Sequence, residues 1–117
     1  MPSRYKGIEG EMVAHDYLVG IGAKILAQNV TLAGAEIDII AVIEGVYAFI
    51  EVKRRSSTRY GRPAEAVSPA KMRKIIRAAS MYLAMNGISD CPVRFDIIEL
   101  LPGSINHIPG AFDASMW

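Results

Sequence analysis

The sequence predicts an α/β fold in which a mixed central sheet is flanked by helices. Three observations support this class: a helical apolar pattern near the start, a run of strand-type segments in the middle, and a second helix followed by a strand. The predicted order of elements is α-β-β-β-α-β. A chain of 117 residues can bury one core but not two, so we expect a single domain over residues 1–117.

The first half of the chain supplies one helix and three strands. Residues 8–21 are predicted helical because apolar side chains recur there at helical spacing, namely Met12, Val13, Tyr17, Leu18 and Ile21. Gly22 is suited to end this helix. Residues 24–30 form a short strand candidate, and residues 36–43 and 46–53 are two further strands. The connection Glu44-Gly45 between the last two indicates a hairpin.

The second half supplies a loop, a helix and a strand. Residues 54–67 are predicted to be a polar loop. Ser68 is a suitable N-cap and Pro69 a suitable first helical residue, so a helix is expected from there to about residue 85, with Asn86-Gly87 as its end. Residues 93–100 are a strand candidate. From about residue 102 prolines and glycines predict an irregular C-terminal tail.

Composition indicates an ordinary globular protein of the cytoplasm. The hydrophobic fraction is 51% and the charged fraction 21%, and no apolar run approaches the ~20 residues that span a bilayer. No apolar segment follows the N-terminal residues, so we expect no secretory signal and no membrane association. The lone cysteine, Cys91, suits a reducing compartment, and the absence of a Cys/His cluster in the sequence argues against structural zinc.

The charges are unevenly distributed along the chain. Nine of the thirteen basic side chains lie between Lys53 and Arg77, whereas only one of the twelve acidic side chains, Glu65, lies there. A basic block in a chain of net charge +1 is the pattern expected of a phosphate-binding face. The alternative is a solvated helix with a solvated loop, and composition alone does not decide between the two.

The predicted hairpin brings two carboxylates together. If Glu44-Gly45 is the turn, Asp38 stands opposite Glu51, with Ile37, Ile39, Ala41 and Ile43 on the other face of the strand. Directly opposed Cβ atoms lie roughly 4.5–5.5 Å apart, where two negative charges repel by about 3 kcal/mol at an effective dielectric of ~20. A bound cation, a proton shared by the pair or a different register would relieve this repulsion.

The cation alternative points to a magnesium site. Carboxylate oxygens are the ligands that Mg²⁺ prefers, and one or two carboxylates commonly suffice. Lys53 follows Glu51 on the same face, where its ammonium could hold an attacking water. A lone Glu-Val-Lys is common on solvated surfaces, and Glu11 alone would be an exposed acid. The opposition of Asp38 and Glu51 beside the basic block favours a site.

Several blocks of the sequence resemble the YraN-like family of small bacterial proteins. The blocks extend over about residues 5–112 and are Gly10-Glu11 with Ala14 and Tyr17-Leu18, Ile25-Leu26 and Asn29, Glu36-Ile37-Asp38-Ile39-Ile40, Phe49-Ile50-Glu51-Val52-Lys53-Arg54-Arg55, Lys71, Arg94-Phe95-Asp96, and His107-Ile108 with Ala111-Phe112. The family is placed in the PD-(D/E)XK nuclease superfamily and compared with archaeal Holliday junction resolvases. This chain departs from it at Ala35, where the family usually has glycine.

The resemblance implies a restriction-endonuclease-like αβββαβ core and a set of site residues. Asp38, Glu51 and Glu11 would be catalytic carboxylates that hold the metal, with the main-chain carbonyl of Val52 as a further ligand. Lys53 would be the catalytic lysine that positions the nucleophile. We therefore expect Mg²⁺, or Mn²⁺, as the cofactor.

The function expected from these observations is metal-dependent hydrolysis of DNA. The residues expected to contact nucleic-acid phosphates are Arg54, Arg55, Lys71, Arg73, Lys74 and Arg77. By analogy with resolvases, branched or junction DNA is the expected substrate and a homodimer would follow, because two strands need two active sites. The alternatives are a non-catalytic nucleic-acid-binding module on the same fold and a partner-binding protein that has inherited the carboxylates.

Overall fold

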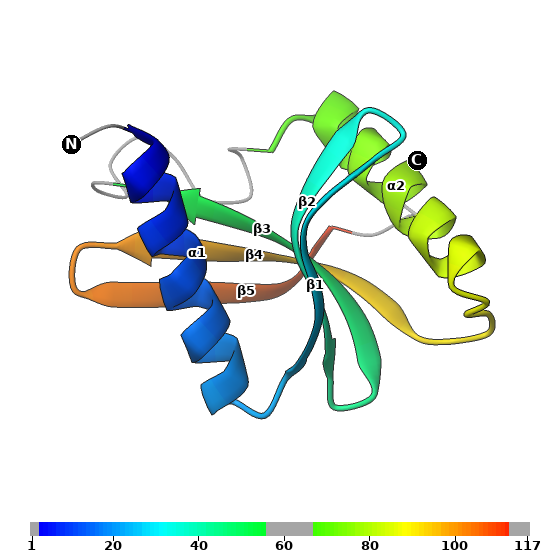
Figure 1. Cartoon of the computed structure of the whole chain (residues 1–117), viewed down its shortest axis with the longest axis horizontal. Helices are drawn as coiled ribbons and strands as arrows, with labels where there is room; N and C mark the ends of the chain where they lie inside the picture. Colours follow the sequence, from blue (N-terminus) through cyan, green and yellow to red (C-terminus); the bar gives the residue numbers. More distant parts are fainter. Residues whose placement is uncertain (1–2, 56–66, 113–117) are drawn as a thin grey trace.

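The computed structural model describes residues 3–55 and 67–112, with side chains from residue 9 onward. One five-stranded mixed sheet has the order β1-β2-β3-β4-β5, in which β3 and β4 are parallel and the other neighbours antiparallel. The predicted fold class is confirmed (Figure 1). The elements are α1 (Ser3–Gly20), β1 (Lys24–Leu32), β2 (Ala35–Ile43), β3 (Val46–Arg54), α2 (Pro69–Met85), β4 (Val93–Leu101) and β5 (Ser104–Phe112).

The two helices cover opposite faces of the sheet. α1 buries Ala14 and Leu18 against alternate residues of the central strands, among them Ile50 and Ile98. Tyr17 packs against the same cluster, whereas Met12 and Val13, which the periodic pattern had included, are exposed. The helix ends as predicted: the chain turns at Gly22, whose φ is +90°, and the N–H of the next residue donates to a carbonyl of the last turn.

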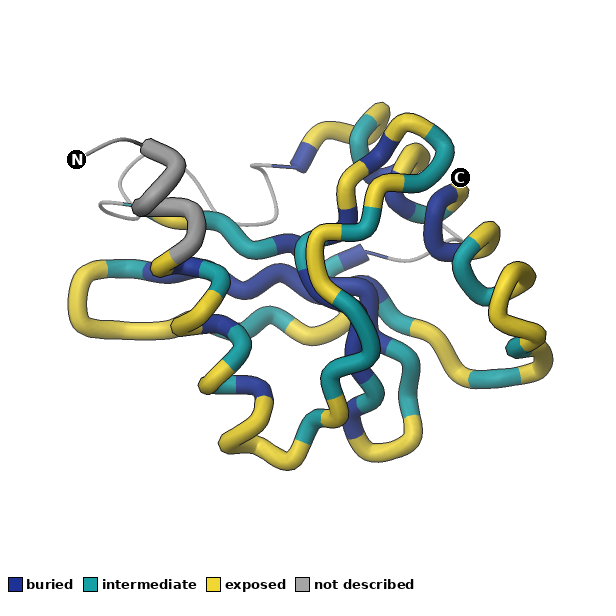
Figure 2. The backbone as a smooth tube through the Cα atoms, viewed as in Figure 1, coloured by how far each residue is buried: buried dark blue, intermediate teal, exposed yellow. Residues whose placement is uncertain are grey.

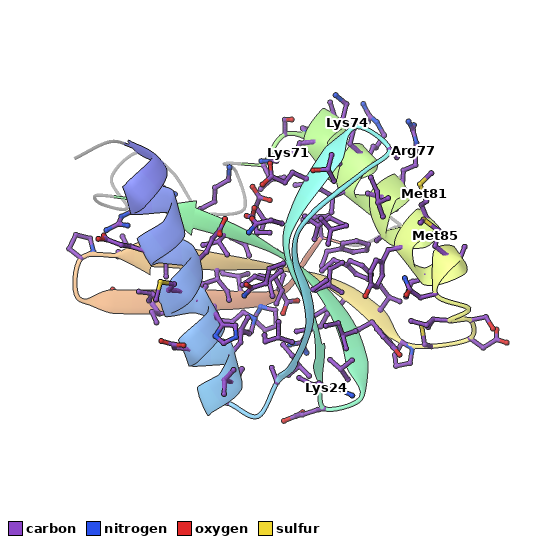
Figure 3. All side chains as sticks on the ribbon, in the orientation of Figure 1. Lys24, Lys71, Lys74, Arg77, Met81 and Met85 are labelled. Carbon is purple, nitrogen blue, oxygen red and sulfur yellow. The ribbon has the colours of Figure 1, made fainter. Side chains whose placement is uncertain are left out.

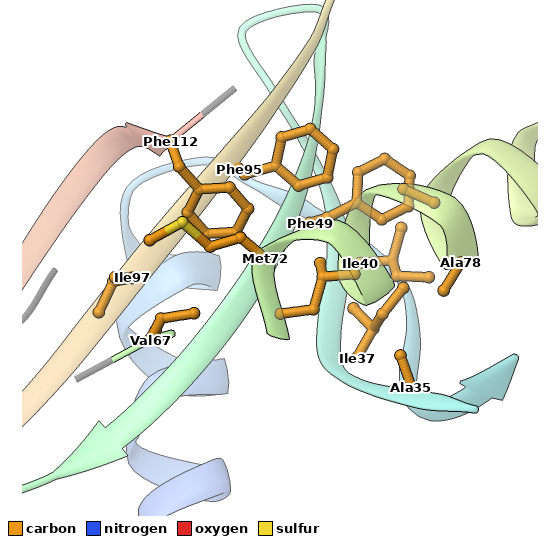
Figure 4. Packing of buried hydrophobic residues seen from close by; sticks show 12 residues of the cluster. Ala35, Ile37, Ile40, Phe49, Val67, Met72, Ala78, Phe95, Ile97 and Phe112 are labelled. Carbon is orange, nitrogen blue, oxygen red and sulfur yellow. The ribbon is translucent and has the colours of Figure 1, made fainter. Parts of the chain in front are cut away.

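The larger core cluster lies between α2 and the other face of the sheet. Phe49 of β3 packs edge-on against Tyr82 of α2 and at a tilt against Phe95 of β4. Phe95 in turn stacks on Phe112 of β5, with ring centroids 5.1 Å apart (Figure 4). Figure 2 shows that the buried residues run along the central strands beneath the helices. α2 thus lies over β1 and β2 and contacts β3 through Phe49.

β2 and β3 pair over only part of their length, and this positions the site. Their ladder has the predicted register, from Ile43–Val46 to Ile39–Ile50, and the Glu44-Gly45 turn has the expected positive φ angles. β3 continues beside β4 as far as Arg54, whereas the first residues of β2 pair with β1. The carboxylates of the predicted site come directly after the last β2–β3 pair.

One predicted face of β2 is wrong where the two strands part. Ile37 was expected to share a face with Ile39, but it joins Ile40 in the cluster under α2, while Ile39 lies in the cluster under α1. Strict alternation therefore breaks at Asp38. Beyond the ladder with β3, β2 belongs to a two-stranded ribbon with β1, and such ribbons twist more strongly than strands inside a sheet. Ala35 is buried in this part of β2.

The predicted irregular tail is also wrong, because residues 104–112 form strand β5. β5 is an edge strand, and an edge strand tolerates proline because one side of its backbone needs no partner. Its pairing with β4 shifts between Ile108 and Phe112, around Pro109 and Gly110. The predicted loop over residues 54–67 lies mostly outside the described residues, as do Arg59 and Arg62.

Candidate metal and nucleic-acid site

Asp38 of β2 and Glu51 of β3 line the same cleft, although the ladder between the two strands ends at Ile39–Ile50, one pair short of the predicted opposition of Asp38 and Glu51. The cleft has a volume of about 430 Å³ and lies where β2 leaves β3, under the N-terminal half of α2. Further lining residues are Glu36 of β2 and Ser68, Lys71 and Lys74 at and beyond the helix start. The two strands supply acids and the helix supplies bases.

Glu51 is nearly buried and is held by two ammonium groups. The side chain is 7% exposed, and its Oε1 lies 2.6 Å from Nζ of Lys71 and 3.3 Å from Nζ of Lys53. Lys53 lies two residues further along β3, so it shares a face with Glu51. A buried carboxylate needs such partners, because leaving it unpaired in a low dielectric is costly.

The start of α2 positions Lys71. Ser68 caps the helix as predicted: its Oγ accepts a hydrogen bond from the N–H of Lys71, at 3.1 Å. Lys71 is thereby fixed in the first turn, and its ammonium reaches across the cleft to β3. Burial acts to lower the pKa of Lys71, but the hydrogen bond and attraction from Glu51 outweigh it and raise that pKa above its ordinary value. Lys71 is therefore a stable cation.

Asp38 bridges the gap between the parting strands. Its Oδ2 accepts a hydrogen bond of 2.7 Å from the backbone N–H of Val52, one residue beyond Glu51. Burial, and next the negative charge of Glu51, raise the pKa of Asp38 from 3.8 to about 7, although the bond from Val52 acts in the opposite direction. In the metal-free protein the repulsion is thus relieved by the lysines on Glu51 and by a higher proton affinity at Asp38.

The other carboxylates near the site differ in their positions. Glu11 of α1 does not line the cleft; its Oε2 accepts a hydrogen bond of 3.0 Å from Nδ2 of Asn29. Its charge nevertheless contributes to the raised pKa of Asp38, and so does the charge of Glu36, which precedes it in size. Sequence reasoning gave Glu36 no role, although its spacing of two from Asp38 was a signal. Both acids add negative potential where Asp38 lies.

The donor set of this cleft suits a hard divalent cation. Among the described residues, no three His, Cys, Asp or Glu side chains gather closely enough to enclose a metal. Mg²⁺ does not require such a cage, since it commonly uses one or two carboxylates together with waters and substrate phosphates. Asp38 and Glu51 would provide these two, and the backbone carbonyl of Val52 remains the expected third donor. The negative potential at Asp38 would favour the ion.

A row of basic side chains extends from the cleft along α2. Lys71 and Lys74 line the cleft, and Lys74, Arg73 and Arg77 are exposed on the helix. In Figure 3, Lys71, Lys74 and Arg77 follow one another along α2, while Lys24 lies at the far end of the molecule. Helical spacing of three residues places Lys71, Lys74 and Arg77 on one side of α2. The row fits both the phosphate-binding face and the solvated helix that the charge pattern left open.

The two arginines after β3 differ from that row. Arg54, at the end of β3, is exposed. Arg55 is only 14% exposed, and its Nη1 lies 3.1 Å from Oε2 of Glu99, which is fully buried. Arg55 lines a hollow beside α1 and the β4–β5 turn, so it lies apart from the exposed basic face of α2.

A second polar cluster, on β4 and β5, was not recognised as a unit from the sequence. Asp96 is fully buried, and its carboxylate accepts hydrogen bonds from Nε of Arg94 and the backbone N–H of Gly110 and pairs with Nε2 of His107 at 2.8 Å. Nδ1 of the same histidine lies 2.9 Å from the hydroxyl of Tyr17 on α1. The cluster therefore ties α1 to the β4–β5 hairpin. The sequence analysis missed this cluster because His107 and Gly110 lie in the segment that was expected to be an irregular tail.

Comparison with known proteins gives a consistent family. Residues 10–100 match the family described as uncharacterised protein family UPF0102. A UPF0102 protein of Clostridioides difficile strain 630 is 49% identical over 114 residues, which cover 96% of this chain and 100% of that protein. UPF0102 proteins of Symbiobacterium thermophilum (48% identity, 86% of each chain) and Persephonella marina (44% identity, 97% of each chain) are also similar. No helix in the described residues is long and apolar enough to cross a membrane.

Proposed function

This chain belongs to the uncharacterised protein family UPF0102, and we propose, from the geometry of its cleft, that it is a metal-dependent nuclease acting on DNA. The observation that carries the proposal is the meeting of Asp38 and Glu51 in one cleft, beside the ammonium groups of Lys53 and Lys71. Two acids can hold a divalent ion for hydrolysis of a phosphodiester, and a nearby lysine and an adjoining basic helix can orient a water and contact phosphates. The PD-(D/E)XK placement belongs to the same proposal.

Each residue has a role in this reaction. Asp38, Glu51 and the carbonyl of Val52 would hold the ion, with Glu11 close enough to add negative potential. A bound Mg²⁺ or Mn²⁺ supplies Lewis-acid polarisation of the phosphodiester and a more acidic water. Lys53 orients that water and offsets the charge that develops on the phosphate. Its present contact with Glu51 keeps the ammonium at the edge of the cleft.

The exposed basic side chains of α2 are the reason for proposing a nucleic acid as the substrate. Phosphate contacts by Lys74, Arg73 and Arg77 would hold a nucleic-acid backbone along the helix and lead it to the cleft. Such contacts carry no base specificity, and so small a chain leaves little surface for base recognition. Branched DNA and a homodimer remain part of this proposal through the analogy with resolvases.

The test is cleavage of labelled flap, four-way and linear DNA by purified protein with Mn²⁺, Mg²⁺ or EDTA. We expect cleavage of at least one substrate in metal and none in EDTA. Asp38→Ala and Glu51→Ala should abolish both cleavage and saturable Mn²⁺ binding, and Lys53→Ala should slow cleavage strongly while metal still binds. Lys24, which is exposed on β1 and does not line the cleft, provides a control position.

A second function is favoured by the occupation of Glu51, which two lysines already neutralise. A non-catalytic nucleic-acid-binding module would bind DNA in a salt-sensitive manner, and this affinity would survive Glu51→Ala but fall when Arg73 and Lys74 are neutralised. No metal-dependent product on any substrate, together with such binding, would refute the nuclease and favour the module. Neither cleavage nor binding would refute both.

A further inference from the structure

The strongest unexplained feature of the cleft is that two ammonium groups share one oxygen of Glu51. Lys71 and Lys53 both lie within ion-pair distance of Oε1, at 2.6 Å and 3.3 Å. One lysine is expected from the Glu-Val-Lys spacing, but the second reaches this oxygen from a different element, twenty residues later in the chain. Glu51 alone does not require two positive charges for neutrality, but Asp38 also attracts Lys71, so the two ammonium groups supply near these two acids the charge that a divalent ion would supply.

We propose that Lys71 occupies the place of the divalent ion at Glu51 in the metal-free protein, and that ion binding displaces its ammonium into the cleft, where it becomes a phosphate contact. The inference rests on the proposed metal site and deepens it: Lys71 regulates when the site accepts metal. The geometry assigns the displaced role to Lys71 rather than Lys53. Lys71 is 42% exposed against 28% for Lys53, and it extends from a helix across open space.

Charge and position make displacement the expected consequence of metal binding. An ion that Asp38 and Glu51 hold together would lie close to the Lys71 ammonium, and a +2 and a +1 charge repel strongly in a partly buried site. The lysine stem is flexible, with several rotatable bonds. The cleft beyond it is lined by Lys74, also of α2, so a phosphate entering there would meet two ammonium groups.

This exchange couples the binding of metal to the binding of nucleic acid. Without metal, Glu51 holds Lys71 and the cleft lacks one of its phosphate contacts. With metal, Lys71 is released toward the substrate, and a bound phosphate in turn keeps Lys71 away from Glu51. Because such coupling is reciprocal, DNA should raise the affinity for metal by the same factor as metal raises the affinity for DNA.

The experiment measures Mn²⁺ affinity by calorimetry for the wild type, Lys71→Met and Lys74→Met, without nucleic acid. Methionine keeps most of the apolar stem while removing the charge. Lys74→Met is the matched control, because it removes the same charge from the same cleft at a side chain that makes no ion pair with Glu51 in the described residues. We expect Lys71→Met to bind Mn²⁺ about ten-fold more tightly, equivalent to about 1.4 kcal/mol, and Lys74→Met to change affinity by about two-fold or less.

Each outcome has a separate meaning. Equal tightening in both variants would overturn displacement in favour of general electrostatics, and weaker binding by Lys71→Met would overturn it in favour of a supporting role for Lys71; both leave the proposed nuclease standing. No Mn²⁺ binding by the wild type or by either variant would overturn the inference together with the metal site. If Lys71→Met does not fold, ¹⁵N spectra of the wild-type lysine ammonium groups replace it: Mg²⁺ should shift the Lys71 resonance, and saturation with Mg²⁺ without a shift would overturn the proposal.

Discussion

Replacing Asp38 with asparagine should make the metal-free protein more stable at pH 8. Asp38 lies partly buried beside Glu51, and its pKa is raised from 3.8 to about 7. Because the folded-state pKa lies above the unfolded value, the contribution of Asp38 to stability is fully present below about pH 4. This contribution is lost as the pH rises through about 7, because the folded protein must then hold Asp38 as a charged, partly buried carboxylate.

The magnitude follows from the pKa shift. A shift from 3.8 to about 7 is roughly three pKa units, and at about 1.4 kcal/mol per unit the ceiling is about 4 kcal/mol. Partial exposure screens the charge, and the exchange replaces a charged hydrogen-bond acceptor for the N–H of Val52 with a neutral one. We therefore expect Asp38→Asn to raise the free energy of unfolding at pH 8 by about 2 kcal/mol.

The assay is urea denaturation in EDTA from pH 5 to pH 8, with Glu51→Gln as the matched control. The stability gain of Asp38→Asn over the wild type should grow as the pH rises through this range. Glu51→Gln also removes one negative charge, yet it should destabilise by about 1–3 kcal/mol because it leaves two lysines without their carboxylate. If Asp38→Asn is neutral or destabilising at pH 8, or if both variants behave alike, the reasoning about charge at Asp38 is wrong.

Three further predictions follow from the same geometry. Lys53→Ala should lower the cleavage rate by about 10²–10³-fold in single-turnover assays while Mn²⁺ affinity is kept, and an equal loss of both would contradict its role. Lys74→Ala and Arg77→Ala should each reduce the slope of log affinity for duplex DNA against log salt by about 0.9, whereas Lys24→Ala, at the far end of the molecule, should leave it unchanged (Figure 3). Asp96→Ala should destabilise by about 1–3 kcal/mol in urea, because it leaves the part-buried donors of Arg94 and His107 without their carboxylate; an effect near zero would contradict a structural role for the cluster.

The sequence predicted those parts of the site that depend on local geometry. The Glu44-Gly45 turn sets the register of β2 against β3, and the alternation along β3 then places Glu51 and Lys53 on one face. The N-cap at Ser68 was equally local, because serine at the N-cap and proline at the first helical position are both typical of a helix start. Such features depend on neighbours in the chain, so a pattern of residue types is enough to find them.

The parts that sequence reasoning missed depend on tertiary structure. The residues that neighbour Lys71 in the chain do not predict the contact between its ammonium and Glu51, because this contact depends on how α2 packs on the sheet. The change of face at Ile37 arises from the twist of a strand that has left its partner. β5 was missed because Pro109 argues against a strand unless the strand lies at a sheet edge or contains a bulge. The sequence alone does not predict which strand lies at the edge.

Asp96 and Asp38 differ in how well the fold compensates their charges. Asp96 is fully buried, yet Arg94, His107 and the N–H of Gly110 surround its carboxylate, so its charge is compensated within the fold. Asp38 is less buried, but burial and neighbouring carboxylates raise its pKa to about 7. A sequence selected for stability alone would place a neutral side chain there, since natural folds depart from local consistency chiefly at functional sites. The unfavourable charge at Asp38 is the feature for which the proposed divalent cation would account.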